Sequence, residues 1–452
     1  MEREEGRKRE RAQEPQRVGE GTYGCVFAPS IKCRESVQVD YSSRVSKLMR
    51  SKNASDEVRS FVKIGKIDPE HEYHTGAPIK CTPRHVSEAA LRECKHGKFS
   101  SRDMEMHPKK YSLLLMKNGG RDLKAMVREF AHRFPSARVT GRFWEQTLHL
   151  MRGLHRFREG GFVHYDIKAH NILFDSATGA MRFIDFGLSG MRATIERKCR
   201  EGKFELARIH FNYPIECAFL ERDSYMRFAE MDDEEQEMYM DSLQDILLNG
   251  LSVAGNPFHI RHLDSRIHEI MASLFAMIDP TDTDEFAYRF VRESLDGIRA
   301  ATRAWSYEQY VRTVLDSVDI YGFGITMQYC LLGFLKHLPY GHPLTDHADA
   351  VEQMHEFFYS TYAPNIMLRV TNIDTLLSTY EPILRQFVAV LPSSAPSVTQ
   401  PSWSHSMPDS SDDVTSSGTD ATTAAATSSL PRSRNVTRRL TSGRPTKYNP
   451  NI

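Results

Sequence analysis

The stretch "FVHYDIKAHNILFD", Phe162 to Asp175, combines an acid, a lysine and an amide with a short apolar run. Asp166, Lys168 and Asn171 are close neighbours in it, and a second acid, Asp185, follows in "MRFIDFGLSG". A carboxylate can accept a proton from an alcohol, and a lysine can neutralise charge on a phosphoryl group. Carboxylate and amide oxygens are ligands that Mg²⁺ prefers. The pattern indicates an acid–base centre beside a magnesium site, if the rest of the chain supplies a phosphate-binding partner.

The residues between the two acids predict a hairpin. "ILFDSATGAMRFI" is typical of two short strands joined by a Ser-Ala-Thr-Gly turn. Such a hairpin would bring Asn171 and Asp185 together.

A glycine cluster near the N-terminus is the candidate phosphate-binding partner. Glycine lets the backbone approach phosphate oxygens without a Cβ in the way. A dinucleotide-binding turn would need a helix directly after the glycines, but "CVFAP" predicts a strand, which favours a hairpin over phosphates. An ordinary glycine-rich hairpin is the alternative. The predicted loop consists of Val18, Gly19, Glu20, Gly21, Thr22, Tyr23, Gly24, Cys25 and Val26.

Lys47 in "RVSKLM" lies on a predicted strand after this hairpin and can reach nucleotide phosphates. Glu57, on a predicted helix after the strand, is the best candidate to hold its ammonium group. Lys32 comes too soon after the glycines and Lys63 falls on the helical side. The alternative is that Lys47 and Glu57 are solvated, as most such residues are.

In chain order, these motifs resemble the eukaryotic-type Ser/Thr protein kinase family over about residues 17–391. The resemblance implies an α+β, two-lobed protein kinase fold, ATP and Mg²⁺ as nucleotide and metal, and protein substrates. The glycine loop would cover ATP, and Lys47 would bind its phosphates and Glu57. Asp166 would be the catalytic base assisted by Lys168, with Asn171 and Asp185 on the metal.

Further parts of the family pattern carry over with changes. "LLLMKNGGRDL" resembles the hinge, with Met116 as gatekeeper, Lys117 facing adenine and Asp122 near the ribose. Tyr213–Glu216, "YPIE", resembles the end of the activation segment. Asp319 in "DIYGFG" resembles the start of a helix whose acid braces the catalytic loop; "DILLNG", beginning at Asp245, is a competing match.

Two departures from the family pattern stand out. Tyr165 replaces the usual arginine before the catalytic Asp, which implies activity that does not need activation-loop phosphorylation. About residues 217–318 form an insertion that looks helical and holds an acidic cluster, Asp232 to Glu237. The cluster is read as a solvated face or a docking site for basic substrates. The long strand-to-strand spacing before "VSKLM", the divergent "YPIE" and this insertion resemble kinases of large DNA viruses, including herpes-like ones.

Composition sets the domain organisation of the 452-residue chain. We expect a charged arm over 1–14, a kinase domain over 15–391 with lobes near 15–118 and 119–391, and a disordered Ser/Thr/Pro-rich tail with a basic end over 392–452. The net charge is zero. No apolar run approaches the length of a membrane span, and the charged N-terminus is no secretory signal. The seven cysteines show no disulfide framework, which predicts reduced thiols inside a cell, in the host cytoplasm or nucleus if the protein is viral.

Other readings stay open. A pseudokinase scaffold would bind nucleotide without efficient transfer, and a kinase-like fold can also act on small molecules. We expect no nucleic-acid partner except through the basic tail. His71, His74, Cys81, His85, Cys94 and His96 crowd one stretch, but their spacing fits no compact zinc motif. Cys25 is expected to be a small strand residue within reach of electrophiles.

Overall fold

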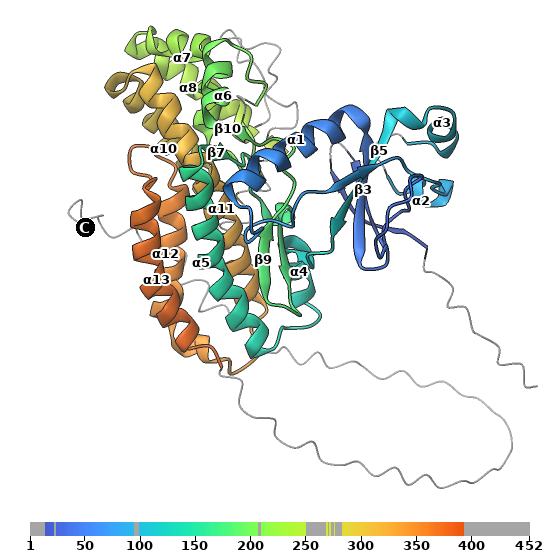
Figure 1. The fold of residues 1–452 in the computed structure, drawn as a ribbon. Coiled ribbons are helices and arrows are strands. Elements are labelled where there is room, and N and C mark those ends of the chain that lie inside the picture. Colours follow the sequence, from blue (N-terminus) through green and yellow to red (C-terminus); the bar gives the residue numbers. More distant parts are fainter. Residues whose placement is uncertain are drawn as a thin grey trace, which may run out of the picture.

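The computed structural model describes residues 14–21, 24–94, 99–206, 209–249, 268–269, 271–272, 275 and 283–392. They form a small part built on a β-sheet and a larger, mostly helical part (Figure 1). The predicted α+β class is confirmed, with an antiparallel sheet first and mainly helices after it. The predicted arm and tail lie outside the described residues, apart from Glu14 and Pro392.

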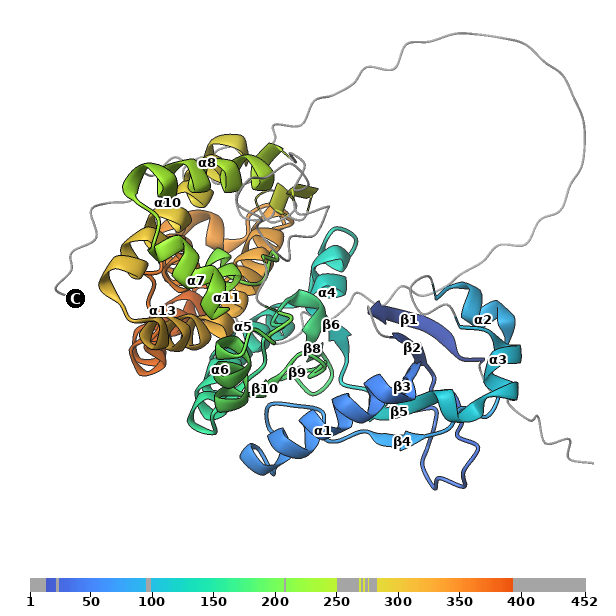
Figure 2. The same cartoon turned by 90° about the horizontal axis from the view of Figure 1, so that it is seen from above.

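The first sheet has five antiparallel strands in the order β1-β2-β3-β5-β4 (Figure 2). Its strands are β1 (Gln16–Gly21), β2 (Gly24–Ala28), β3 (Arg44–Arg50), β4 (Ile79–Cys81) and β5 (Tyr111–Lys117). Helix α1 (Ser51–Ile67) packs against β3 and β5 and buries Ala54, Glu57, Phe61 and Ile64. Their spacing of three and four residues puts them on one helix face. Short helices α2 (Glu88–Arg92), α3 (Ser101–Met106) and η1 (Pro108–Lys110) precede β5.

The larger part contains two small sheets and a group of long helices. Strands β6 (Arg121–Asp122), β8 (Ile172–Asp175) and β9 (Ala180–Phe183) form one sheet, and β7 (Phe162–Val163) pairs with β10 (Gly190–Met191). The helices are α4 (Leu123–Phe130), α5 (Ala137–Glu159), α6 (Arg192–Arg200), α7 (Arg222–Ala229), α8 (Asp233–Asn249), α10 (Thr283–Ala304), α11 (Tyr307–Lys336), α12 (Ala348–Tyr362) and α13 (Ile373–Ala389). Three short 3₁₀ turns are η2 (Ala169–Asn171), η3 (Ile215–Phe219) and η5 (Pro343–Asp346).

Helix α5 shows how the sequence builds this part. Ser136 caps its first turn by accepting a hydrogen bond from the Val139 N–H. The face at three- and four-residue spacing, which includes Trp144, Leu148 and Met151, is buried. Helix α5 runs beside α13 (Figure 1), so this face forms part of the main core.

Helix α11 is the central helix. By length and composition it could cross a membrane, but 72% of its apolar window is buried inside the protein. It begins at Tyr307, so Asp319 lies inside the helix and the expected helix start at Asp319 is wrong. The reason is that Ser306, inside the predicted insertion, caps the helix by accepting a hydrogen bond from the Gln309 N–H, so α11 begins twelve residues before Asp319.

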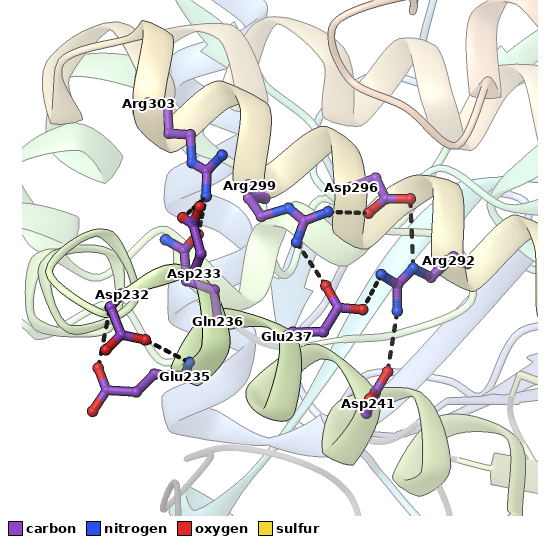
Figure 3. A network of polar contacts seen from close by, with 10 residues as sticks. All are labelled: Asp232, Asp233, Glu235, Gln236, Glu237, Asp241, Arg292, Asp296, Arg299 and Arg303. Carbon is purple, nitrogen blue, oxygen red and sulfur yellow. Dashed lines mark hydrogen bonds and ion pairs between the residues drawn. The ribbon is translucent and has the colours of Figure 1, made fainter.

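The described part of the insertion is helical, as predicted, and its acidic cluster is mostly paired (Figure 3). Glu237 of α8 binds Arg292 and Arg299 of α10, and Asp233 binds Arg303. Asp232 and Glu235 bond to each other's backbone N–H groups in a capping box. Because these carboxylates already have partners, the cluster ties α8 to α10, which argues against a docking site for basic substrates.

The cysteines correct one prediction. Cys25 is bonded to Cys94 and Cys33 to Cys81 as disulfides, so four of the seven thiols are not reduced. Cys25 is fully buried, and the expected access for electrophiles is therefore wrong. The sequence spacing hid these pairs because each joins a strand residue, Cys25 of β2 or Cys81 of β4, to a cysteine outside the strands that lies 69 or 48 positions away.

Candidate functional site

The glycine cluster lies on a hairpin, as predicted, and not on a turn before a helix. Gly21 pairs with Gly24 and Gly19 with Val26, with a bulge between Arg17 and Gly19. A Cβ on Gly24 would come within 2.4 Å of the Leu48 carbonyl oxygen, so β2 can approach β3 this closely only with glycine there. The hairpin tip, Thr22 and Tyr23, lies outside the described residues.

Lys47 joins the sheet, helix α1 and the D-F-G segment. It lies on the central strand β3, opposite Val26 of β2. Its ammonium nitrogen is 2.8 Å from Glu57 Oε2 and 2.9 Å from Asp185 Oδ1. The competing lysines, Lys32 and Lys63, are exposed on a loop and on the outer face of α1. The structure thus brings Lys47 and Glu57 together and adds Asp185 to the pair.

The three charges shift one another's pKa values. Burial alone would lower the pKa of Lys47, but the charges of Asp185 and Glu57 outweigh burial and raise it. Burial also raises the pKa of Glu57, and Lys47 only partly offsets this. The pKa of Asp185 falls despite burial because Lys47 and Lys168 face it. Lys47 and Asp185 are therefore held ionised, which suits binding of a polyphosphate and a cation.

The catalytic-loop stretch is braced from α11. Asp319 accepts hydrogen bonds from the backbone N–H groups of His164 at 2.7 Å and Tyr165 at 2.8 Å. Burial raises the pKa of Asp319. Tyr165 has a φ of 66°, a left-handed conformation that is costly for a bulky residue. The two hydrogen bonds that Asp319 accepts hold this strained turn directly before Asp166. Asp245 of the competing match instead accepts a hydrogen bond from Asn249 within α8.

Asp166 is surrounded by donors. Lys168 Nζ lies 2.9 Å from both carboxylate oxygens, and Asn171 Nδ2 lies 2.8 Å from Oδ2. Asn212 Nδ2 lies 2.9 Å from Oδ1. Sequence reasoning missed Asn212, because it contacts Asp166 from 46 residues away and no motif marks it.

The predicted metal ligands lie at the same end of one hairpin. Strand β8 pairs with β9 through Ile172 and Phe183, and the Ile184 N–H bonds the Asn171 carbonyl at 2.9 Å. Asn171 uses its amide NH₂ for Asp166, and Asp185 uses Oδ1 for Lys47. The hydrogen bonds of the described residues leave Asn171 Oδ1 and Asp185 Oδ2 unused. Asn171 Oδ1 and Asp185 Oδ2 are hard oxygen ligands, and Lys47 holds the Asp185 carboxylate through its other oxygen. This pair of oxygens fits Mg²⁺.

The predicted hinge joins the two parts. Met116 and Lys117 end β5, where Met116 is half-buried and Lys117 is exposed. Asp122 caps α4 by accepting from the Ala125 N–H at 2.8 Å, and it lies 3.6 Å from His170. Burial would raise the pKa of Asp122, but His170 and the cap bonds outweigh burial and lower it.

The segment after D-F-G is anchored at three points. The hydroxyl of Tyr165, the residue that replaces the arginine of the family pattern, donates to the Leu206 carbonyl at 3.0 Å. Arg192 bonds Asp316 and the Arg312 carbonyl, both on α11. At its end, Glu216 of "YPIE" makes a fully buried ion pair with Arg369 at 2.8 Å.

The His/Cys stretch does not form one ligand cluster among the described residues. His74 is buried and bonds Asp68 and the Gly76 N–H, whereas His85 is exposed beside Glu105. Cys81 and Cys94 are in disulfides, and His96 lies outside the described residues. Cys33, Glu35 and Cys81 come within 4.8 Å of one another, but the two sulfurs are bonded to each other.

Comparison with known proteins agrees with the motifs. Residues 87–200 match the family model of the protein kinase domain, a range with the hinge, catalytic loop and D-F-G. A stretch of 78 residues is 32% identical to the serine/threonine-protein kinase mos of Patiria pectinifera, over 17% of this chain. The match spans 21% of that relative's length, about a fifth. The central part of the chain is thus similar to protein kinase domains.

Proposed function

We propose that this protein is a Ser/Thr protein kinase that transfers the γ-phosphoryl group of ATP to protein hydroxyls. The observation that carries the proposal is the contact of Lys47 on β3 with Glu57 on α1 and with Asp185 of the distant D-F-G segment, next to the Asp166 loop. An ionised lysine held between two carboxylates beside a glycine hairpin suits the binding of nucleotide phosphates, and Asp166 adds a base for transfer. The similarity of residues 87–200 to protein kinase domains supports the same function.

The residues then have separate tasks. Lys47, held by Glu57, binds the phosphates of ATP, and the glycine hairpin covers them. The acceptor hydroxyl gives its proton to Asp166 as its oxygen bonds to the γ-phosphorus, and the bond to the ADP oxygen breaks. Lys168 neutralises charge on the phosphoryl group in transit. Asn171 and Asp185 would hold Mg²⁺, which neutralises the phosphates when bound.

The pseudokinase alternative predicts nucleotide binding without transfer. The test is to incubate the purified full-length protein with labelled ATP, Mg²⁺ and a generic acceptor such as casein. The proposal expects multiple turnovers and label on Ser or Thr. Nucleotide binding with no transfer would support the pseudokinase, and label on Tyr would contradict the Ser/Thr assignment.

Protein substrates are part of the proposal, and Lys168 two residues after the base supports the Ser/Thr choice. An intracellular location stays a prediction from the cysteine spacing. The two disulfides count against it, since disulfides persist mainly in oxidising compartments. Resemblance to kinases of large DNA viruses also stays a prediction.

A further inference from the structure

The acceptor positions of the Asp166 carboxylate are filled by donors of the chain itself. Lys168 contacts both oxygens, Asn171 contacts Oδ2, and Asn212 contacts Oδ1, all at 2.8–2.9 Å. An ionised carboxylate offers about four lone-pair positions, and these contacts number four. A substrate hydroxyl can therefore bond Asp166 only after one of the donors has left.

Burial indicates which donor leaves. The Lys168 side chain is 25% exposed and ends a flexible four-carbon chain. Asn171 and Asn212 are 5% and 2% exposed. Each amide also has a second backbone acceptor: Asn171 bonds the Asp166 carbonyl at 2.8 Å, and Asn212 bonds the Ile167 carbonyl at 3.4 Å. Lys168 is thus the exchangeable donor, and the two amides are fixed.

The orientation of the Asn212 amide is set from its other side. His210 Nδ1 contacts Asn212 Oδ1, which can only accept, so this ring nitrogen carries the proton. The contact turns the amide NH₂ group toward Asp166. The His210 ring is held in turn by Phe211 and Tyr213, at centroid distances of 4.6 and 5.2 Å.

Helix α11 supports the catalytic loop and Asn212 together. A Cβ on Gly322 would come within 2.6 Å of the Ile167 carbonyl oxygen and 3.4 Å of the Asn212 carbonyl oxygen. Only glycine lets α11 approach the Ile167 backbone this closely, and the Asn212 backbone lies at an ordinary contact distance from the same position. The same helix carries Asp319, which binds the loop just before Asp166. The catalytic loop and the Asn212 segment therefore pack against the same helix.

We propose that Asn212 is a positioning residue for phosphoryl transfer. Asn212 bonds Oδ1 of Asp166 and Asn171 bonds Oδ2, so the two amides together fix the orientation of the carboxylate. The substrate hydroxyl takes the place of Lys168. The inference rests on the proposed kinase activity and goes beyond the family motifs, none of which includes Asn212.

The first test removes the donor. Asn212→Leu keeps a similar size without an amide and should lower kcat ~10²-fold, because a misplaced catalytic group loses its attack geometry. The KM for ATP should stay unchanged, since Asn212 contacts no residue assigned to the nucleotide. Asn212→Thr, which keeps a short donor, should recover part of the rate. Asn249→Leu is the matched control: this amide also donates to a carboxylate, Asp245 at 3.1 Å, but in α8.

A second measurement separates positioning from folding. Thermal unfolding of the wild type, Asn212→Leu and Asn212→Thr is compared with kcat and with the KM for ATP of the same proteins. A positioning role predicts a lower kcat in Asn212→Leu with an unchanged Tm and an unchanged KM for ATP, and partial recovery of kcat in Asn212→Thr.

Each outcome decides a different claim. Wild-type protein without turnover overturns the proposed function and this inference with it. Wild-type turnover with an unchanged kcat in Asn212→Leu overturns the inference alone. A slow Asn212→Leu with a lower Tm, combined with no recovery of kcat in Asn212→Thr, means that Asn212 only supports the fold, and also overturns the inference.

Discussion

Arg369→Met should destabilise the protein by about 3–5 kcal/mol, because it leaves the Glu216 carboxylate buried without its cation. Both side chains are almost completely buried, at 1% and 0% exposed, and their N–O distance is 2.8 Å. Arg369 also donates to the Ala363 carbonyl at 2.8 Å. Methionine fills most of the same space, so the loss reflects charge and hydrogen bonding more than a cavity.

The destabilisation should depend on pH. Burial already raises the pKa of Glu216, and Arg369 opposes this. Without Arg369 the folded-state pKa rises further above the unfolded value. A carboxyl group with a raised folded-state pKa destabilises the fold above that pKa, and the penalty fades as pH falls through it. Arg369→Met should therefore lose more stability at about pH 8 than at about pH 5.

Urea unfolding of both proteins at the two pH values measures these differences. The double variant Arg369→Met with Glu216→Leu should recover most of the loss, because it removes the unpaired charge. A loss below about 1 kcal/mol, or an equal loss at both pH values, would refute the claim that Glu216 is a buried, ionised partner of Arg369.

Three other outcomes are expected. Activity should survive phosphatase treatment. Tyr165 replaces the arginine that would bind a phosphate on the activation segment, and its hydroxyl bonds the Leu206 carbonyl directly. Loss of turnover that ATP preincubation restores would contradict this. Asp185→Ala should lose Mg²⁺-dependent ATP binding in calorimetry, and unchanged affinity would exclude a metal role for Asp185. Deleting residues 431–452 should leave the kinase rate unchanged, since the catalytic motifs end before that segment; a large drop would mean that the tail acts on the kinase domain.

The local elements near the motifs could be predicted because their signals are local. The glycine hairpin, the strand with Lys47 and the β8–β9 hairpin depend on turn residues and alternation within a few positions. The buried face of α5 follows from three- and four-residue spacing. The structure also brings Lys47 and Glu57 together, the pair that the family resemblance implied. The contact of Lys47 with Asp185 was not predicted.

Contacts across the fold could not be predicted from local pattern. The Cys25–Cys94 and Cys33–Cys81 bonds depend on how the loops with Cys33 and Cys94 pack against β4 and β2, which spacing does not encode. Asn212 reaches Asp166 through the packing of both segments on α11. The start of α11 was misplaced because its early turns are part of the insertion and match no family motif.

The central claim is that Asp166 acts on the acceptor hydroxyl and not on the nucleotide, and Asp166→Asn tests it most directly. Asparagine has nearly the same shape as aspartate and can still accept hydrogen bonds from neighbouring donors of the chain, but it cannot take a proton from the acceptor hydroxyl. Transfer from labelled ATP to a protein acceptor and ATP affinity should be measured on the same preparation. We predict a rate lower by ~10²–10⁴-fold with nearly unchanged ATP affinity. Near wild-type turnover in Asp166→Asn would contradict the account.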